Sequence, residues 1–481
     1  MKKTKPNIVL MYADDMGYGD FGAFNDGNVL TPNLDDLISG STCLSQHYAG
    51  SPVCSPSRAS LLTGRYPHRT GAITPQEVRG MDRIHSSETT IGDVFGSNGY
   101  STGLIGKWHN GALNPKYHPN NRGFQEFVGF SGGWADYYDW NLDINGSISP
   151  SDGRYLTDVL GDAAVDFIKR HASDPFLLML PFNAPHTPLQ APEEITNYYE
   201  EKGLNRGVSL TYAMIQKMDE SVGRVLQTLE DYKLADNTIL MFTSDNGPAF
   251  SLRDDHIPKN GNADTTRFNC GFKGSKASVY EGGIRVPMII RWPDGLPKGT
   301  NEITELVHFT DWLPTLMSAV GIEHKFSKDL DGFNILPQLR SEEPWIEPRR
   351  FWQWNSYQPV GFVNAAMRKG DWKLVRPNII PEFATDLDLE LDKDYVKTDI
   401  EYKYFPENVT DLMNSPDPVQ LWRDNQALEL FNIREDPLES QNLVEKYPQY
   451  AQSMLKELET WFEQVNSELL VAQRETLNRI S

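Results

Sequence analysis

The segment from Ser51 to Arg65 places a cysteine, a proline and an arginine where they could bind and attack an anion. Cys54 is followed two positions later by Pro56 and four positions later by Arg58. A proline in the first turn, with small and apolar residues after it, predicts a turn into a short helix that begins at Cys54. The free amide groups at a helix start attract negative charge, and Arg58 adds a fixed, planar cation one turn further on. The segment therefore predicts an anion-binding position, whereas a single cysteine such as Cys54 is by itself more typical of a small buried residue.

Two polar pairs could hold a metal ion. Asp14 and Asp15 follow one short apolar run, and Asp245 and Asn246 follow another. Their side chains offer only oxygen ligands, which suits Ca²⁺ or Mg²⁺ and argues against zinc or iron. A solvated loop or a helix cap would explain one such pair by itself. Two pairs that each follow a buried strand instead predict one shared site for a hard cation.

The elements that would position these residues can be read from apolar periodicity. Short apolar runs that end in polar residues predict buried strands at Asn7–Tyr12, Phe176–Pro181, Thr238–Thr243 and Val286–Trp292. Between them, apolar residues repeat every three or four positions, as in amphipathic helices, at Asp158–His171, Leu210–Tyr232 and Thr304–Val320. This alternation predicts an α/β fold in which helices sandwich a large, mostly parallel sheet.

The chemically interesting residues follow these predicted strands. Ligands of parallel sheets bind beyond the carboxyl ends of the strands. The first and third strands lead into the two polar pairs, and the strand at Phe176–Pro181 is followed by His186. We therefore expect three separate segments to point at one rim of the sheet.

A second, smaller unit begins near residue 340. Ser341–Pro344 and Glu347–Pro348 are typical of a linker, and the chain of 481 residues is long enough for two units. Strand-like segments, an acidic stretch and an amphipathic helix follow, at Phe351–Trp354, Phe362–Arg368, Trp372–Arg376, Glu382–Asp394 and Tyr447–Asn466. We predict a catalytic domain over residues 1–340 and a C-terminal α+β subdomain with an antiparallel sheet over residues 341–481.

Composition narrows the range of partners and compartments. A formal net charge of −21 argues against nucleic acid, which needs a basic surface. No apolar stretch approaches the roughly 20 residues that cross a bilayer, so no membrane partner is expected. Three cysteines cannot form a dense disulfide framework. The apolar run Ile8–Met11 is too short for a signal peptide, which predicts a cytoplasmic protein, or a periplasmic or secreted one if a leader has been trimmed.

Several sequence blocks resemble those of the formylglycine-dependent type I sulfatases, in the alkaline-phosphatase-like superfamily. The stretch from Cys54 to Arg58, followed by Leu62-Thr63-Gly64-Arg65, is similar to the family signature. Six further blocks resemble family blocks in the family's order: Ala13–Asp20, Thr31–Asp35, Gly106–His109, Ala184–Leu189, Thr243–Gly247 and Lys276–Gly283. Met367–Leu374 and Leu430–Pro437 look like parts of the family's C-terminal subdomain.

The resemblance implies a sulfuric ester hydrolase and assigns its cofactors. Cys54 would be converted after translation to formylglycine by a formylglycine-generating enzyme. The oxidised residue 54 and the two polar pairs would hold one divalent cation, Ca²⁺ or alternatively Mg²⁺. Asp20 would be a supporting loop residue and not a ligand.

The same resemblance assigns the residues around the sulfate, which are Arg58, Lys107, His109, His186 and Lys276. Lysines act as movable charges on sulfate oxygens, and histidines can give or take a proton near neutral pH. His186 would donate to the leaving alcohol oxygen, and His109 would be the base that helps the hydrated aldehyde to expel sulfate. Lys273 competes with Lys276, which is preferred because its spacing to the next block matches the family.

Hydrated formylglycine would present two hydroxyls, one to attack sulfur and one whose deprotonation releases sulfate. A thiol lacks that exit, so an unmodified Cys54 should be nearly inactive. The segment Ser131–Trp140 gathers four aromatic residues, which suit sugar rings but would equally pack a loop over the core. We favour a small sulfated saccharide as substrate, because so acidic a chain would not attract a long polyanion; aryl sulfates should also react.

Two other functions remain open at this point. A phosphate or phosphonate ester hydrolase of the same superfamily would handle a tetrahedral anion with similar metals and cations. A non-catalytic protein that binds sulfated glycans would keep the fold but leave Cys54 as a thiol.

Overall fold

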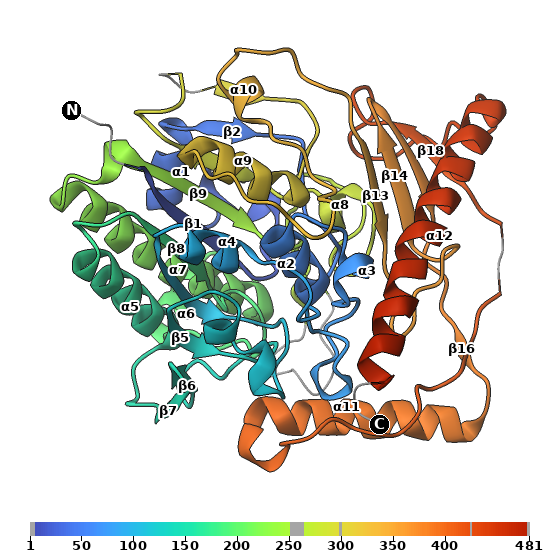
Figure 1. Cartoon of the computed structure of the whole chain (residues 1–481), viewed down its shortest axis with the longest axis horizontal. Coiled ribbons are helices and arrows are strands. Elements are labelled where there is room, and N and C mark those ends of the chain that lie inside the picture. Colours follow the sequence, from blue (N-terminus) through green and yellow to red (C-terminus); the bar gives the residue numbers. More distant parts are fainter. Residues whose placement is uncertain (1–4, 251–263, 298–300, 424–425, 479–481) are drawn as a thin grey trace.

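The computed structural model of the chain describes residues 5–250, 264–297, 301–423 and 426–478 (Figure 1). Within these residues a ten-stranded sheet has the order β11-β2-β10-β9-β1-β8-β4-β5-β6-β7. Neighbouring strands from β9 to β5 are parallel, whereas β10 and the β6–β7 hairpin are antiparallel to their neighbours. The predicted α/β fold with a mostly parallel sheet is thus confirmed. The strands span Asn7–Ala13 (β1), Thr42–Leu44 (β2), Ser101–Lys107 (β4), Glu126–Phe130 (β5), Asn141–Ile144 (β6), Ser147–Pro150 (β7), Phe176–Pro181 (β8), Thr238–Ser244 (β9), Met288–Arg291 (β10) and Asn301–Ile303 (β11).

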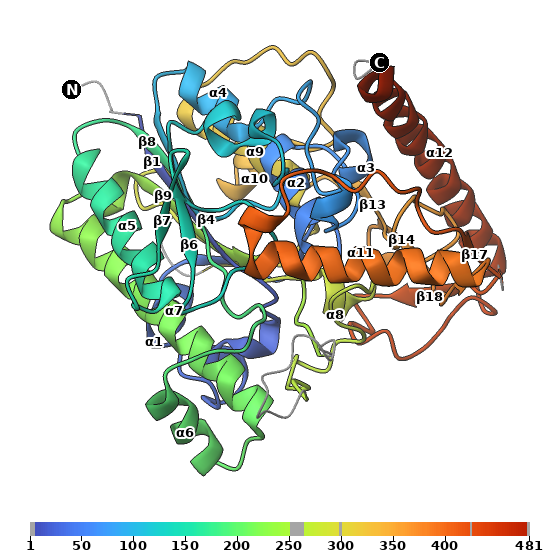
Figure 2. The same ribbon diagram turned by 90° about the horizontal axis from the view of Figure 1, so that it is seen from below.

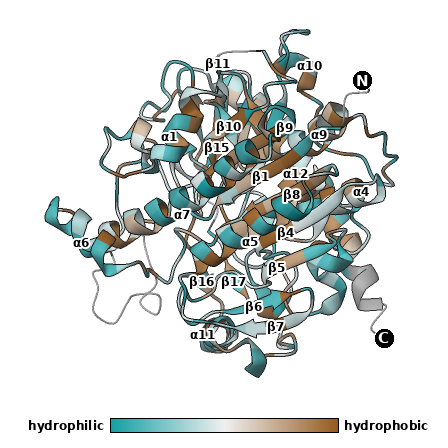
Figure 3. Cartoon of the chain, turned by 90° about the vertical axis from the view of Figure 1, so that its left-hand side faces the viewer, coloured by the Kyte–Doolittle hydropathy of each residue, from teal (hydrophilic) through white to brown (hydrophobic). Residues whose placement is uncertain are grey.

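Helices cover both faces of this sheet, as the alternation of side chains in β1 requires. Val9, Met11 and Ala13 face one core, whereas their neighbours Ile8 and Leu10 face the other. The first core is closed by α1 (Pro32–Ser39), α5 (Leu156–Arg170) and α7 (Arg206–Asp231), and the second by α2 (Cys54–Thr63), α4 (Ile91–Ser97) and α9 (Trp312–Val320). In Figure 3 the central strands are brown and the helices around them carry teal outer faces. None of the helices in the described ranges is long and apolar enough to span a membrane.

The helix predicted at Thr304–Val320 is wrong in its first half. Val307–His308 forms β12 beside β3 (His47–Tyr48), and α9 begins only at Trp312. The Asp311 carboxylate accepts the His308 amide at 2.9 Å, and His308 Nδ1 accepts the Thr310 amide at 3.2 Å. These side chains satisfy the amides that an earlier helical turn would have used, so the helix starts after them.

A second sheet lies beyond residue 340, with the order β13-β14-β15-β18, all antiparallel. Its strands are β13 (Arg349–Gln353), β14 (Ala365–Lys369), β15 (Trp372–Arg376) and β18 (Glu429–Asn432). One face packs on α12 (Pro448–Asn478) through Met367 and Leu374, and the other packs on the first unit through Ala366 and Val375. This sheet and helix are the predicted elements; the domain boundary at residue 340 stays a prediction.

The acidic stretch Glu382–Asp394 forms β16 (Glu382–Phe383) and the first half of a helix, α11 (Asp386–Tyr404). Thr385 caps this helix, because its side chain accepts the Asp388 amide at 3.2 Å. Figure 2 shows α11 crossing the underside of the molecule. It contacts the short 3₁₀ helix η3 (Glu77–Arg79), so a C-terminal element reaches the first unit.

Candidate active site

Cys54 is the first residue of α2, as predicted, and it is buried. Val53 before it has extended backbone, which ends the preceding loop and turns the chain into the helix. Burial raises the pKa of the Cys54 thiol, and Lys107 and Lys276 offset only part of that effect. A thiol with a raised pKa is a poor nucleophile at neutral pH. The encoded cysteine is therefore placed for chemistry that its own thiol is poorly suited to perform.

Arg58 lies one turn into α2 and joins three elements. Its Nε and Nη2 lie 2.8 and 2.7 Å from Asp245 Oδ2, at the end of β9. Its Nη1 donates to the Lys107 carbonyl at 3.0 Å, at the end of β4. Burial opposes the charge on Arg58, but Asp245 and Asp14 outweigh burial and raise its pKa. Arg58 thus fixes α2 against the strand ends with a charge that is always present.

The two polar pairs meet because β1 and β9 are neighbouring parallel strands whose ends, Ala13 and Ser244, lie side by side. The Asp15 amide donates to Asp245 Oδ1 at 3.3 Å, and Asn246 Nδ2 donates to Asp15 Oδ1 at 2.7 Å. Asp15 has a φ of 70°, a left-handed conformation that non-glycine residues adopt at a cost. Strain of this kind is found where a side chain must be held for function.

These residues fit a hard cation. Asp14 Oδ1 and Asn246 Oδ1 are buried acceptor atoms without a hydrogen-bond partner. Candidate ligand atoms of Asp14, Asp15 and His186 lie within 4.8 Å of one another. Buried carboxylates at this spacing repel one another unless positive charge lies between or beside them. Buried oxygens without a hydrogen-bond partner are the kind of donor that Ca²⁺ and Mg²⁺ prefer.

Two lysines supply positive charge at the same place. Lys107 Nζ lies 2.5 Å from Asp14 Oδ2, and Lys276 Nζ lies 2.8 Å from Asp15 Oδ2. Burial opposes ionisation of Asp15, but Lys276 and His186 outweigh burial and lower its pKa. Lys273 instead pairs with Glu429 of β18 at 3.0 Å. The choice of Lys276 over Lys273 from sequence therefore agrees with where the two side chains lie.

His186 follows β8 and faces Asp15, with 3.7 Å between Nε2 and Asp15 Oδ2. Its Nδ1 lies 2.8 Å from the Thr187 carbonyl, which can only accept, so Nδ1 carries a proton. Burial and the charge of Lys276 hold the pKa of His186 well below its ordinary value. Its Nε2 can therefore donate a proton only after His186 has taken one up.

His109 follows β4 and has a φ of 53°, so it shares the left-handed backbone of Asp15. It is buried, and burial and the charge of Lys107 hold its pKa well below the ordinary value. Its Nε2 lies 3.4 Å from Glu77 Oε1. His109 is thus a neutral imidazole that can accept a proton.

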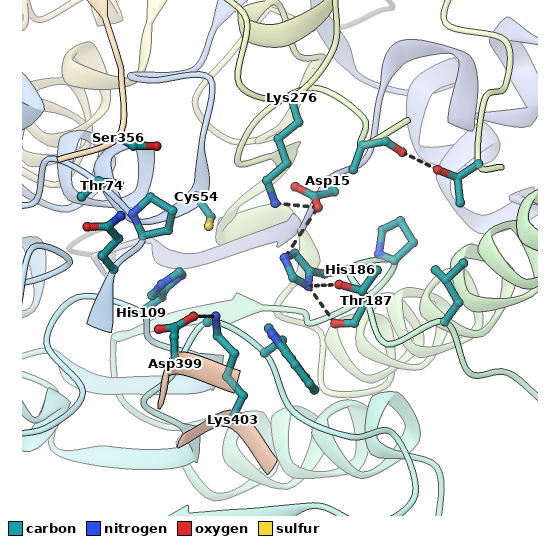
Figure 4. A pocket seen from close by; sticks show the side chains of 18 of the residues that line it. Asp15, Cys54, Thr74, His109, His186, Thr187, Lys276, Ser356, Asp399 and Lys403 are labelled. Atoms are coloured by element: carbon teal, nitrogen blue, oxygen red, sulfur yellow. Dashed lines mark hydrogen bonds and ion pairs between the residues drawn. The ribbon is translucent and has the colours of Figure 1, made fainter. Parts of the chain in front are cut away.

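One pocket brings these groups to solvent (Figure 4). It has a volume of about 290 Å³. Five predicted site residues line it: Asp15, Cys54, His109, His186 and Lys276. The other five are fully buried and joined to Asp15 through the contacts above: Asp14, Arg58, Lys107, Asp245 and Asn246. The structure therefore brings all ten predicted residues into one group.

The pocket also contains residues that sequence reasoning missed. Its lining includes Trp354, Ser356, Tyr395, Asp399 and Lys403, all from beyond residue 340. Tyr395, Asp399 and Lys403 belong to α11. The spacing of Asp399 and Lys403 is that of an ordinary pair on a helix surface, so it carried no signal of a site.

The aromatic segment Ser131–Trp140 contributes one ring to the pocket and another to packing of a loop. Trp134 lines the pocket and meets Tyr404 of α11 edge-on, with ring centroids 4.7 Å apart. Tyr137 is buried, stacks on Tyr155 and donates to the His186 carbonyl at 2.9 Å. One ring therefore faces the pocket while another supports the loop of His186.

Comparison with known proteins places this geometry in a family context. A family model described as sulfatase matches residues 6–322, and one described as N-sulphoglucosamine sulphohydrolase, C-terminal, matches residues 273–415. N-acetylgalactosamine-6-sulfatase of Sus scrofa is 34% identical over 366 residues, which are 69% of this chain and 66% of that protein. Arylsulfatase H of Canis lupus familiaris is 30% identical over 426 residues, covering 70% of this chain and 73% of that protein.

Solved structures agree in fold. Ps i-CgsB, in complex with k-i-k-neocarrahexaose, has a TM-score of 0.77 and 29% identity, covering 95% of this chain and 93% of that one. The PsFucS1 sulfatase from Pseudoalteromonas sp. has a TM-score of 0.70 at 21% identity, covering 97% and 91%, which shows a shared fold.

Proposed function

Because the chain belongs to the sulfatase family, whose model matches residues 6–322, we propose that it hydrolyses a sulfate ester, with Cys54 converted to formylglycine as its nucleophile. The observation that carries the proposal is that Cys54, Asp15, Lys276 and two histidines line one pocket, while Lys107 and the rest of the two polar pairs lie buried directly behind them. The raised pKa of the buried thiol supports conversion, since the encoded side chain is a poor nucleophile.

We propose that Asp14, Asp15, Asp245, Asn246 and the oxidised residue 54 hold one Ca²⁺, with Mg²⁺ as the alternative. The all-oxygen donor set and the two unpaired buried oxygens support this choice. Bound there, the cation would neutralise charge on the sulfate and help to position it.

Two lysines and two histidines of the chain would bind the sulfate and transfer the protons. Lys107 and Lys276 lie against Asp14 and Asp15 and would turn their free N–H groups to sulfate oxygens. His186 would donate to the leaving oxygen, because a bound anion beside it favours its protonated form. His109 would accept the proton whose removal releases sulfate, which suits a neutral imidazole.

We propose a small sulfated saccharide as the substrate. A pocket of about 290 Å³ lies just below the usual range for small-molecule sites, roughly 300–1,000 Å³, which suits a small substrate. Trp134 and Trp354 in its lining offer flat surfaces to sugar rings. Two of the similar proteins point the same way: one is named an N-acetylgalactosamine-6-sulfatase, and Ps i-CgsB was solved with a neocarrahexaose.

The test is sulfate release by the full chain co-expressed with a formylglycine-generating enzyme. Conversion should lower the intact mass by about 18 Da relative to the thiol form. The converted protein should release sulfate from defined sulfated mono- and disaccharides and from 4-nitrophenyl sulfate, faster than it releases phosphate from 4-nitrophenyl phosphate. Faster phosphate release would instead identify a phosphate ester hydrolase. Saccharide binding without release by the converted protein would identify a glycan-binding protein.

A further inference from the structure

The pocket wall formed by α11 contains charged side chains that the proposed reaction does not use. Figure 4 places Asp399 and Lys403 across the pocket from Lys276, on the side of His109. Lys403 pairs with Asp399 one turn earlier in α11, and its Nζ lies 3.7 Å from Glu77 Oε2. Glu77 is fully buried in η3. A carboxyl, a carboxylate and an ammonium therefore lie together next to a catalytic histidine.

Glu77 makes different contacts through its two oxygens. Oε1 accepts the Gly133 amide at 2.6 Å and lies 3.4 Å from His109 Nε2. Oε2 lies 3.7 Å from Lys403 Nζ, and Lys403 is the residue that pairs with Asp399. Burial and the neighbouring Asp399 raise the pKa of Glu77 well above its ordinary value.

Glu77 Oε1 is an acceptor next to the His109 ring. Neither ring nitrogen of His109 has a hydrogen-bond partner in the structure, and Nε2 lies 3.4 Å from Oε1. A carboxyl oxygen at that position favours the neutral form of the ring with its hydrogen on Nε2. Nδ1 is then free to accept a proton. Asp399 pairs with Lys403 on the other side of Glu77.

We propose that Glu77 is a positioning residue for His109: it fixes the ring with its hydrogen on Nε2, and α11 holds Glu77 in place through Asp399 and Lys403. The inference rests on the proposed function for the role of His109. The consequence is that α11, a helix of the C-terminal part of the chain, helps to determine which ring nitrogen of His109 carries the hydrogen.

The proposal is tested by four variants of the converted protein. Glu77→Met removes the acceptor and should lower kcat by about tenfold or more, with KM within about twofold, because the histidine loses its orientation. Glu77→Gln should retain kcat within about threefold, because its carbonyl oxygen can replace Oε1 as the acceptor next to His109. Lys403→Met should lower kcat in the same direction. Lys393→Met, on the exposed face of α11 and paired with Glu390, is the matched control and should change neither constant.

A purely structural role for Glu77 would give a different pattern. Equal kcat in wild type, Glu77→Met and Lys403→Met would overturn the proposal, as would equal losses in Glu77→Gln and Glu77→Met. If Glu77→Met does not fold, Lys403→Met and Glu77→Gln still decide it.

A second measurement does not need activity. Nitrogen-15 NMR of histidine-labelled protein, with His109→Gln to identify the signal, should show the proton on Nε2 in wild type and a mixture of forms in Glu77→Met. A wild-type His109 with its proton on Nδ1 would refute the inference. If the wild type releases no sulfate, the proposed function fails, whereas the NMR result still reports on Glu77 and His109.

Discussion

The two sides of the pocket are built by different means. On the anion side, Asp14, Asp15, His186 and Asp245 each follow a buried strand, and neighbouring strands align their ends. On the other side, the helix α11 meets the 3₁₀ helix η3, and Lys403 of α11 lies against both Asp399 and Glu77. Strand ends in a packed sheet have little freedom, whereas a helix laid over the surface can differ between relatives without disturbing them.

The charges of the two sides differ in the same way. The anion side concentrates Arg58, Lys107 and Lys276 against buried carboxylates, an arrangement suited to a cation and a sulfate. The α11 side has no excess charge to offer a second anion, because Asp399 and Lys403 form a pair. We infer that the anion side carries the groups that react. The α11 side would orient His109 and shape the space available to the leaving group.

The largest expected effect is on the anion side. Cys54→Ala removes the side chain that we propose is converted to formylglycine, so kcat/KM for aryl sulfate should fall by about 10⁴-fold or more. The thermal midpoint should stay within a few degrees of wild type, because a small buried side chain is replaced by one slightly smaller. Sulfate release measured with both proteins gives the comparison. Full activity in the variant would refute the assignment of the nucleophile.

Arg58→Met tests how strongly the anion side depends on its buried charges. It leaves the buried Asp245 without its ion-pair partner and Asp14 with Lys107 alone, which should cost about 3–5 kcal/mol in the free energy of unfolding. Urea unfolding followed by fluorescence measures this. The matched control is Arg434→Met, which breaks an exposed pair with Asp371 and should cost under about 1 kcal/mol. Equal losses of unfolding free energy in the two variants would contradict the inference that the buried ion pairs of Arg58 stabilise the protein.

These two sides also differ in how much of them could be predicted. The strands at Phe176–Pro181 and Trp372–Arg376 were predicted to the residue, because apolar or strongly β-forming runs lie between short segments that contain Asp, Asn and Pro. All ten predicted site residues came together, since short motifs and strand ends identified them. The start of α9 was missed because its N-terminal capping depends on His308 and Asp311, which no periodic pattern marks.

The α11 side could not be predicted from the sequence, and the reasons are physical. The acidic sequence of α11 lacks a regular apolar repeat, so it gave no helix signal. Glu77 lies in a short turn outside any motif, and its importance comes only from contacts with Gly133, His109 and α11. The left-handed backbone of Asp15 and His109 is likewise set by packing, because neither residue type requires it.

A smaller effect should follow from crowding the contact between the two sides. A Cβ at Gly133 would come within 2.6 Å of Glu77 Oε1 and 3.0 Å of His109 Nε2. Gly133→Ala should therefore displace the Glu77 carboxyl while keeping every titratable group, and kcat should fall by about tenfold with KM little changed. Gly132→Ala, next in the chain, faces Tyr402 at 3.0 Å instead and is the control. The same kcat for Gly133→Ala and wild type would argue that the spacing between Glu77 and His109 is unimportant.

The smallest effect is expected when Lys273 is replaced. Its side chain belongs to the contact between the two units and not to the pocket. Its Nζ pairs with Glu429 of β18 and lies 4.1 Å from the centre of the Tyr280 ring. The side chain is partly exposed, so Lys273→Met should cost at most about 1 kcal/mol in unfolding free energy. Because the Lys276 ammonium is the one that faces Asp15, kcat and KM should stay within about twofold of wild type. A tenfold rise in KM for Lys273→Met, measured with an aryl sulfate, would mean that the anion side extends further toward the C-terminal sheet than its contacts indicate.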